Sequence, residues 1–237
     1  MTCHEPVEEF SRPALWSYAN HSISKVPVAT TQKSLVSCVT VTQCGNFGVL
    51  GHQSGAITKI SLQSGKEKNK FMSQHADEVT GLGVDVLNRH LVSSSLDGTI
   101  KLWDFYRGKL MISVDHGAAI ENLCYNRLND LVAISTSDLS LSLLNVKTGL
   151  KRVRHFPDAA TNKITDICFS QDSKWLLTSS MDRCIRVWDV VTGSLLDWIE
   201  FKSAPLSLDF SPSGEFLATA HLNSRAVFLW SNKAFFQ

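Results

Sequence analysis

One short pattern occurs five times along the chain at a nearly constant interval, and this repeat constrains the fold more than any other feature. Each occurrence is a pair of residues typical of a tight turn. The pairs are Ser54-Gly55, Asp97-Gly98, Asp138-Leu139, Asp182-Arg183 and Asn223-Ser224, and the steps from Ser54 to Asp97, Asp138, Asp182 and Ser224 are 43, 41, 44 and 42 residues. A period in the low forties, with four short strands per unit, is typical of the blades of a β-propeller.

Two further positions repeat in step with the turns. A glycine follows each of the first four turns by eleven residues, and a large hydrophobic residue stands six residues after each turn. The glycines are Gly65, Gly108, Gly149 and Gly193, and the hydrophobic residues are Ile60, Trp103, Leu144, Trp188 and Trp230. Between them lie short β-branched and aromatic runs separated by Gly, Asp, Asn and Ser, as in antiparallel strands. The sequence therefore predicts an all-β, WD-repeat propeller with four-stranded blades.

The repeat also predicts how the chain divides. Residues 1–33 are predicted to be the end of a preceding, truncated blade, and residues 34–237 to form five WD-type blades, with a weak last strand near residues 234–236. This makes about five and a half blades, whereas a seven-bladed ring at ~42 residues per blade needs about 295 residues. Because an open ring leaves strand edges unpaired, we expect these blades to be an incomplete part of a larger ring. A small ring of five or six blades is the alternative.

Composition narrows the class of protein. The net charge is +1, so no overall field favours nucleic acid or an anionic membrane, and the apolar runs are too short to span a bilayer. None of the six cysteines forms a Cys-x-x-Cys pair, and the eight histidines show no metal-binding spacing. We therefore expect an intracellular protein with buried free thiols, no cofactor, no metal and no small-molecule substrate.

Several repeated residues are predicted to stabilise the blades. His75, Asp97 and Trp103 fall where WD-repeat blades place a loop histidine, a turn aspartate and a third-strand tryptophan, so that the aspartate holds the histidine and the turn amides. The full predicted set is His75, Asp97, Trp103, Asp138, Asp182, Trp188 and Trp230. A catalytic His-Asp pair is the alternative, but no nucleophile stands at a matching position, so we expect no enzyme.

Candidate partner contacts lie in the loops expected at one face of the propeller. They are Gln53, Asp77, His116, Lys163, Arg183 and His221. Arg183 is the most suggestive, because the equivalent turn positions hold Gly55, Gly98 and Leu139. An exposed arginine can bind a carboxylate or phosphate through two hydrogen bonds; the alternative is that Arg183 is only solvated.

Two basic runs, at residues 66–70 and 151–155, are predicted to lie in outermost strands. Charged side chains on an exposed edge discourage the addition of another strand. Contact with RNA phosphates is the alternative. We favour the first interpretation, because no aromatic residues that would stack on bases are interleaved with the charges.

Residues of the last two units, and a short segment near the start, resemble a particular family. The segments that carry the resemblance are 44–47, 164–170, 180–189, 203–206, 211–221 and 228–232. They are similar to the WD-repeat subunit of the UTP-B subcomplex of the small-subunit processome, which has two tandem propellers and a carboxy-terminal helical domain. The resemblance runs from about residue 13 to residue 232, and it identifies the chain with most of the second propeller.

The resemblance implies a nucleolar, non-enzymatic scaffold that supports pre-rRNA processing and small-subunit biogenesis. The implied partners are other WD-repeat and UTP-B proteins of the processome, with indirect contact to pre-rRNA or small nucleolar RNP. The alternative is a WD-repeat substrate receptor or adaptor of a ubiquitin ligase or other complex. Such receptors often carry Trp-Asp-x-Arg, but here the two Trp-Asp pairs continue as Phe105-Tyr106 and Val190-Val191.

Overall fold

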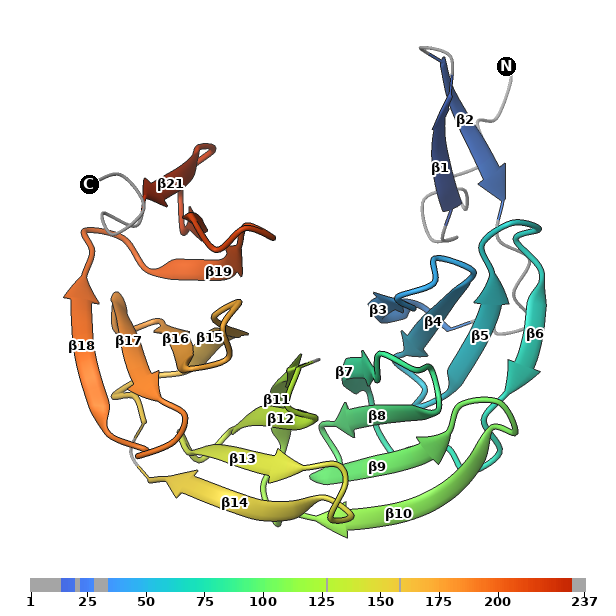
Figure 1. Cartoon of the computed structure of the whole chain (residues 1–237), viewed down its shortest axis with the longest axis horizontal. Helices are drawn as coiled ribbons and strands as arrows, with labels where there is room; N and C mark the ends of the chain where they lie inside the picture. Colours follow the sequence, from blue (N-terminus) through green and yellow to red (C-terminus); the bar gives the residue numbers. More distant parts are fainter. Residues whose placement is uncertain (1–13, 20–21, 28–33, 127, 158, 232–237) are drawn as a thin grey trace, which may run out of the picture.

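The computed structural model describes residues 14–19, 22–27, 34–126, 128–157 and 159–231, and all of its regular structure is β-strand (Figure 1). Blade 1 consists of β3 (Val36–Val41), β4 (Phe47–His52), β5 (Ile57–Ser61) and β6 (Glu67–Lys70). Blade 2 consists of β7 (Val79–Val84), β8 (His90–Ser95), β9 (Thr99–Asp104) and β10 (Lys109–Asp115). No helix that is long and apolar enough to cross a membrane occurs in the described part of the chain.

The remaining blades follow the same plan. Blade 3 consists of β11 (Ile120–Asn126), β12 (Leu131–Thr136), β13 (Leu141–Asn145) and β14 (Lys151–Phe156). Blade 4 consists of β15 (Ile164–Phe169), β16 (Trp175–Ser180), β17 (Cys184–Asp189) and β18 (Leu195–Glu200). Blade 5 has three described strands, β19 (Pro205–Phe210), β20 (Phe216–His221) and β21 (Val227–Ser231). A separate hairpin pairs β1 (Ala14–Ala19) with β2 (Ser22–Pro27).

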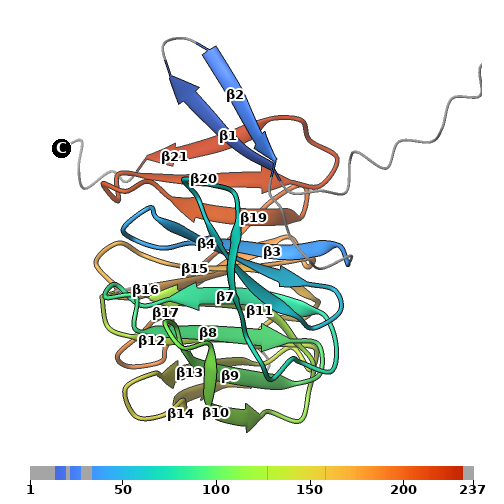
Figure 2. The same cartoon turned by 90° about the vertical axis from the view of Figure 1, so that its right-hand side faces the viewer.

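Each blade is an antiparallel meander, and the blades stand side by side in an arc (Figure 1). The first strands of the blades, β3, β7, β11, β15 and β19, lie on the inner side of the arc, and β6, β10, β14 and β18 lie on the outer side. Figure 2 shows the arc from its side, with most strands running across the view one above another. The predicted all-β propeller is confirmed.

The inner strands are joined by one repeated hydrogen bond. In four blades, a polar side chain near the start of the inner strand donates to the carbonyl oxygen of the first residue of the next inner strand. The bonds are Ser37 to Val79 (2.6 Å), Thr80 to Ile120 (2.9 Å), Asn122 to Ile164 (3.1 Å) and Thr165 to Pro205 (2.7 Å). In blade 5 the equivalent residue is Leu206, which has no donor and is 40% exposed. The sheets are thus tied through side chains rather than through a continuous backbone ladder.

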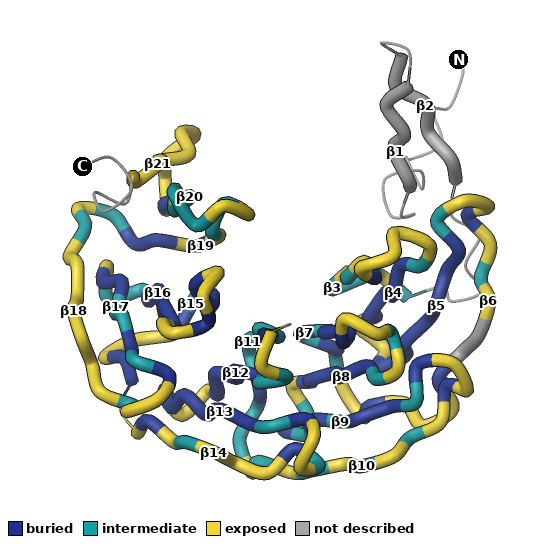
Figure 3. Tube along the Cα trace, viewed as in Figure 1, coloured by how far each residue is buried: buried dark blue, intermediate teal, exposed yellow. Residues whose placement is uncertain are grey.

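The hydrophobic core lies between the blades. One cluster joins blades 1 and 2, another joins blades 2 and 3, and a third joins blades 3 and 4. Aromatic pairs cross two of these interfaces: the ring centroids of Phe71 and Trp103 are 5.5 Å apart, and those of Phe156 and Trp188 are 5.1 Å apart. Figure 3 shows the pattern, with buried segments where the sheets face one another and exposed segments along the outer strands. A blade therefore buries its apolar residues only against its neighbours.

Several expectations about organisation have mixed outcomes. The basic runs lie in β6 and β14, which are outermost strands as predicted. The expected strand near residues 234–236 lies outside the described residues, as do 1–13, 20–21 and 28–33 of the expected truncated blade. Within 1–33, the structure describes the backbone of the β1–β2 hairpin.

Two glycines with similar backbone conformations are predicted to differ sharply in how much their substitution by alanine destabilises the protein. One of them, Gly55, lies in the turn between β4 and β5. Gly55 has φ +77°, and a Cβ there would lie 2.2 Å from the carbonyl oxygen of His75; Gly117 has φ +79° and open space around it. Gly117→Ala should cost about 1–2 kcal/mol of unfolding free energy, from the left-handed conformation alone. Gly55→Ala should cost at least ~2 kcal/mol more, because the backbone of the next loop must move.

Urea unfolding of the two variants beside the parent chain measures the difference. Equal destabilisation by both substitutions would contradict the close approach at Gly55.

Candidate interaction face

The meander places two kinds of connection at the same end of every blade. The turns between second and third strands (53–56, 96–98, 137–140, 181–183 and 222–226) and the described residues of the loops between blades (71–78, 116–119, 157, 159–163 and 201–204) all lie there. We call this end the loop face. The other end carries the turns between first and second strands and, in blades 1 to 4, those between third and fourth strands. All six candidate partner contacts belong to the loop face or its border.

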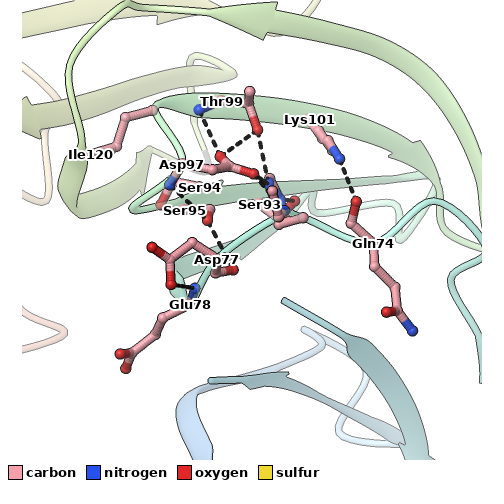
Figure 4. A network of polar contacts seen from close by, with 12 residues as sticks. Gln74, Asp77, Glu78, Ser93, Ser94, Ser95, Asp97, Thr99, Lys101 and Ile120 are labelled. Carbon is pink, nitrogen blue, oxygen red and sulfur yellow. Dashed lines mark hydrogen bonds and ion pairs between the residues drawn. The ribbon is translucent and has the colours of Figure 1, made fainter. Parts of the chain in front are cut away.

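In blade 2 a chain of hydrogen bonds runs from the core to the loop face, and Figure 4 shows Ser93, Asp97 and Thr99 of this network. Trp103 Nε1 donates to Ser93 Oγ at 2.8 Å, and Ser93 Oγ lies 2.7 Å from His75 Nε2. His75 Nδ1 lies 2.9 Å from Thr99 Oγ1 and 3.3 Å from Asp97 Oδ2. One assignment satisfies every group: His75 carries its proton on Nδ1, and Ser93 donates to Nε2. The histidine is thereby held in one orientation under the loop.

Charge is divided unequally between these two titratable groups. Burial lowers the pKa of His75 to about 4, although the neighbouring Asp97 opposes this. Burial raises the pKa of Asp97, but hydrogen bonds from the Thr99 hydroxyl and the amides of Ala76 and Thr99 outweigh it and bring the pKa to about 2. At neutral pH the histidine is neutral and the aspartate ionised. The pair holds the turn and the preceding loop together.

Blade 4 builds the same support with different residues. Asp182 accepts hydrogen bonds from the amide and hydroxyl of Thr161, at 3.1 and 2.9 Å. In blade 2 the corresponding aspartate, Asp97, contacts the loop that contains His75. Arg186 adds an ion pair with Asp182 at 2.8 Å, and Trp188 Nε1 donates to Thr178 at 3.1 Å. Asp182 and Trp188 were predicted from the sequence, whereas Thr161 and Arg186 were not. Spacing was the signal for Thr161, because Thr161 and Asp182 are 21 residues apart, as are Ala76 and Asp97.

The remaining predicted blade residues have simpler surroundings. Trp230 Nε1 donates to Thr219 at 3.0 Å in blade 5. Asp138 is exposed; its carboxylate accepts hydrogen bonds from the Thr136 hydroxyl at 2.5 Å and the Ser140 amide at 3.1 Å. It thus holds its own turn, without a histidine partner among the described contacts.

Three candidate partner contacts are exposed side chains on the loop face: Gln53, Asp77 and Arg183. Arg183 has φ +70°, and its guanidinium lies 3.4 Å from Glu200, an exposed pair that is weak by itself. Lys163 is also exposed and lies 3.0 Å from Glu121 of the preceding blade. His116 is half-buried, with Nδ1 3.4 Å from Arg152 Nη2. A partner role for these five residues stays a prediction.

His221 does not fit the expectation of a partner contact. It is 5% exposed, its Nδ1 lies 3.0 Å from the Ser203 carbonyl oxygen, and its Nε2 lies 2.9 Å from Thr219. The equivalent position in other blades makes the same tie to a carbonyl 18 residues upstream, through Ser95, Ser180 and His52. His221 is therefore a buried support of the loop face. The His221 side chain bonds to the same kind of carbonyl group as the serines at the equivalent positions. The place of a residue near a turn in the sequence does not show that its side chain points inward.

The basic run in β14 is partly used inside the protein. Arg154 Nη2 donates to the carbonyl oxygen of Val191 in blade 4, and Arg152 reaches His116 at the end of blade 2. Lys151 and His155 are exposed. Two of the basic side chains thus join blade 3 to both neighbours.

Two sources of reactivity to consider in the described residues are metal-binding clusters and ionised thiols. No group of three or more His, Cys, Asp or Glu side chains is placed to hold a metal ion within the described ranges. Burial raises the pKa of the Cys38 thiol to about 11 and that of Cys168 to about 12, so both are protonated at neutral pH. The arrangement is suited to holding a surface in shape.

The neutral, buried His75 predicts a loss of stability in acid. Since its pKa falls from 6.5 to about 4 on folding, the unfolded chain binds more protons between these values. The contribution of His75 is fully present above pH 6.5 and is lost as the pH falls toward about 4. Asp97 acts at lower pH, because its contribution is present above pH 3.8 and is lost as the pH falls to about 2.

Urea unfolding at a series of pH values measures the slope of the unfolding free energy against pH. The slope for His75→Asn should be smaller by up to about one proton between pH 4 and 6.5. An unchanged slope would show that His75 does not carry this dependence.

The sequence of this chain is similar to a described protein family and to several known proteins. Residues 1–237 match the family model described as the WDR36/Utp21 second beta-propeller domain. The chain is 36% identical over 224 residues to U3 small nucleolar RNA-associated protein 21 homolog of Schizosaccharomyces pombe, covering 94% of this chain and 25% of the relative. It is 34% identical to U3 small nucleolar RNA-associated protein 21 of Saccharomyces cerevisiae, over 100% of this chain and 25% of that protein.

Two further likenesses complete the comparison. WD repeat-containing protein 36 of Homo sapiens is 36% identical over 198 residues, which are 83% of this chain and 22% of that protein. The beta-propeller domain of Cps50 (Swd1) from Myceliophteria thermophila has a TM-score of 0.75 at 19% identity, covering 86% of this chain and 67% of that one, and supports the fold alone. The chain spans about a quarter of the length of the curated relatives it matches.

Proposed function

The chain belongs to the WDR36/Utp21 second beta-propeller family, and from this premise we propose that it is a non-enzymatic scaffold of the small-subunit processome. In this role it supports pre-rRNA processing and small ribosomal subunit biogenesis through protein–protein contacts. The observation that carries the proposal is the match along the whole chain to a family whose relatives are named for association with U3 small nucleolar RNA. The corresponding location is the nucleolus.

The architecture supports a scaffold. The blades are joined by inner-strand hydrogen bonds and shared cores, so the loop face is a fixed surface across several sheets. Its exposed polar and charged residues include Gln53, Asp77 and Arg183. Turns such as those at Asp97 and Asp182 are held by side-chain hydrogen bonds. Such a surface can bind a large partner without rearranging. The proposed partners are other WD-repeat and UTP-B proteins, through which the chain contacts pre-rRNA and small nucleolar RNP indirectly.

We further propose that residues 34–237 are five blades of one propeller and residues 1–33 the end of another blade in the same, larger ring. The antiparallel β1–β2 pair supports this division, because the third and fourth strands of a blade also form an antiparallel pair. Leu206, which lacks the donor found in the other inner strands, has an exposed side chain suited to a further apolar neighbour.

Charge reversal on the loop face tests the proposed function. In the full-length protein, Asp77→Lys combined with Arg183→Glu should lower the recovery of U3 RNA and of UTP-B proteins with the tagged protein by about tenfold, the effect of losing ~1.4 kcal/mol of contact energy. The matched control is Lys109→Glu, a charge reversal at an exposed position of the outer strand β10. Recovery is measured by quantitative RNA and protein detection after affinity purification.

Sedimentation separates the outcomes. Co-migration of the parent protein with early pre-ribosomal particles is expected. A parent protein that sediments only as free protein would overturn the scaffold role, and equal recovery with the loop-face and Lys109 variants would move the contacts away from the loop face.

A further inference from the structure

Equivalent clefts between neighbouring blades are filled in different ways, at the end of the blades opposite the loop face. Between blades 3 and 4 the cleft is filled by Arg154. Its Nη2 donates to the Val191 carbonyl oxygen, and its stem crosses Gly193 so closely that a Cβ on the glycine would lie 2.9 Å from Arg154 Cδ. This arginine faces Leu143 in the strand register.

Between blades 1 and 2 another cation of the chain fills the cleft. Lys59 is 4% exposed, and its Nζ donates to the Phe105 carbonyl oxygen at 2.9 Å. The ammonium also lies 4.4 Å from the centroid of the Phe105 ring, a cation–π contact. Lys59 stands five residues after Ser54, as Leu143 stands five residues after Asp138. Two of the blade interfaces therefore take up a basic side chain that donates to the third-to-fourth-strand turn of the next blade.

Between blades 2 and 3 both equivalent positions are apolar. Leu102 stands five residues after Asp97, as Lys59 stands after Ser54, and Ile112 faces Leu102 as Arg154 faces Leu143. A cleft of about 180 Å³ lies here, the size of one large side chain. Its apolar wall includes Leu102, Met111, Ile112 and Val146, and its polar lining includes Asp85, Arg89, His90, Asp130 and Lys147.

Asp85 is the buried acid of this cleft, with its side chain 6% exposed. Its Oδ1 accepts hydrogen bonds from the amides of Arg89 (2.6 Å) and His90 (3.1 Å). Its Oδ2 has only longer contacts, 3.6 Å to Arg89 Nε and 3.5 Å to His90 Nδ1. A carboxylate oxygen without a short hydrogen bond, on a side chain that is only 6% exposed, can gain from a further donor.

Asp130 supplies the second carboxylate, on the blade 3 side. Its Oδ2 lies 2.8 Å from Lys147 Nζ, and its Oδ1 accepts a hydrogen bond from the Tyr125 hydroxyl at 2.8 Å. The Lys147 and Arg89 side chains are 71% and 60% exposed, so both cations lie at the mouth of the cleft. Exposed pairs of this kind contribute little and are readily exchanged.

We propose that this blade 2–3 cleft binds an arginine side chain presented by a partner protein. The aliphatic stem lies against Leu102, Met111 and Ile112, as the Arg154 stem lies across Gly193 in the neighbouring cleft. The guanidinium donates to Asp85 Oδ2 and shares Asp130 with Lys147. Arginine fits better than lysine, because its planar fork can donate to two acceptors at once. The site lies away from the loop face, and its test does not depend on the processome.

Titration of the ¹⁵N-labelled chain with N-acetyl-L-arginine methylamide, followed by NMR, tests the proposal. Saturable shifts are expected at the amides of Arg89, His90, Lys147 and Gly149. The citrulline derivative, which has the same shape without charge, should bind at least ~tenfold more weakly. Asp85→Asn should weaken the binding of the arginine derivative by a similar factor.

Two arginine substitutions provide a matched pair. Ile112→Arg places an arginine at the position that corresponds to Arg154 in the cleft between blades 3 and 4. Because this side chain would occupy the blade 2–3 cleft, the saturable shifts should be abolished. Ser113→Arg adds the same side chain one residue along, at an exposed position of the same strand, and should leave binding unchanged. The Asp85→Asn and citrulline comparisons remain decisive if Ile112→Arg fails to fold.

Three results would overturn the proposal. The first is equal binding of the arginine and citrulline derivatives. The second is that N-acetyl-L-glutamate methylamide, titrated in the same way, binds more tightly than the arginine derivative, through Arg89 and Lys147. The third is that Ser113→Arg loses the shifts as completely as Ile112→Arg does.

Discussion

Burial between neighbouring sheets is the constraint on which the rest of this structure depends. Trp103, Leu144 and Trp188 reach low exposure only because the adjacent blade covers them. A single blade has two faces to cover and no second layer of its own, so stacking supplies the core. The hydrogen bonds from Ser37, Thr80, Asn122 and Thr165 then fix the spacing of the inner strands. Both the loop face and the clefts at the opposite end are consequences of that stacking.

Variation among the blades follows a physical rule at one pair of positions, in the second and third strands. In blades 2, 4 and 5 an indole donates to a serine or threonine, as Trp103 does to Ser93. Blades 1 and 3 replace donor and acceptor together, with Leu50 and Ile60 in one and Ile134 and Leu144 in the other, all four buried. Replacing both partners leaves no buried polar group unpaired, whereas replacing one would leave a costly orphan. The repeat thus varies in pairs of residues.

The candidate site was predictable to the extent that spacing determines it. Asp97, Asp182 and the tryptophans were found because they recur at fixed intervals, and their contacts are those expected of turn and core residues. His221 was misassigned, because a histidine near a turn gives no indication of which way its side chain points. Here it points inward to Ser203. Thr161 was missed because it stands where blade 2 has Ala76, beside the histidine position, which is Ala160 in blade 4.

The sequence by itself determined the strand plan, the number of described blades and the turn residues, since periodicity and turn chemistry are local properties that survive in one dimension. The tertiary structure decided how each interface is filled, because this depends on residues from two blades meeting. Leu102 and Ile112 leave open a cleft whose counterparts hold Lys59 and Arg154, and no single unit of the repeat contains that information. Which charges are free for partners was decided in the same way: Arg154 is used between blades, whereas Asp77 stays exposed.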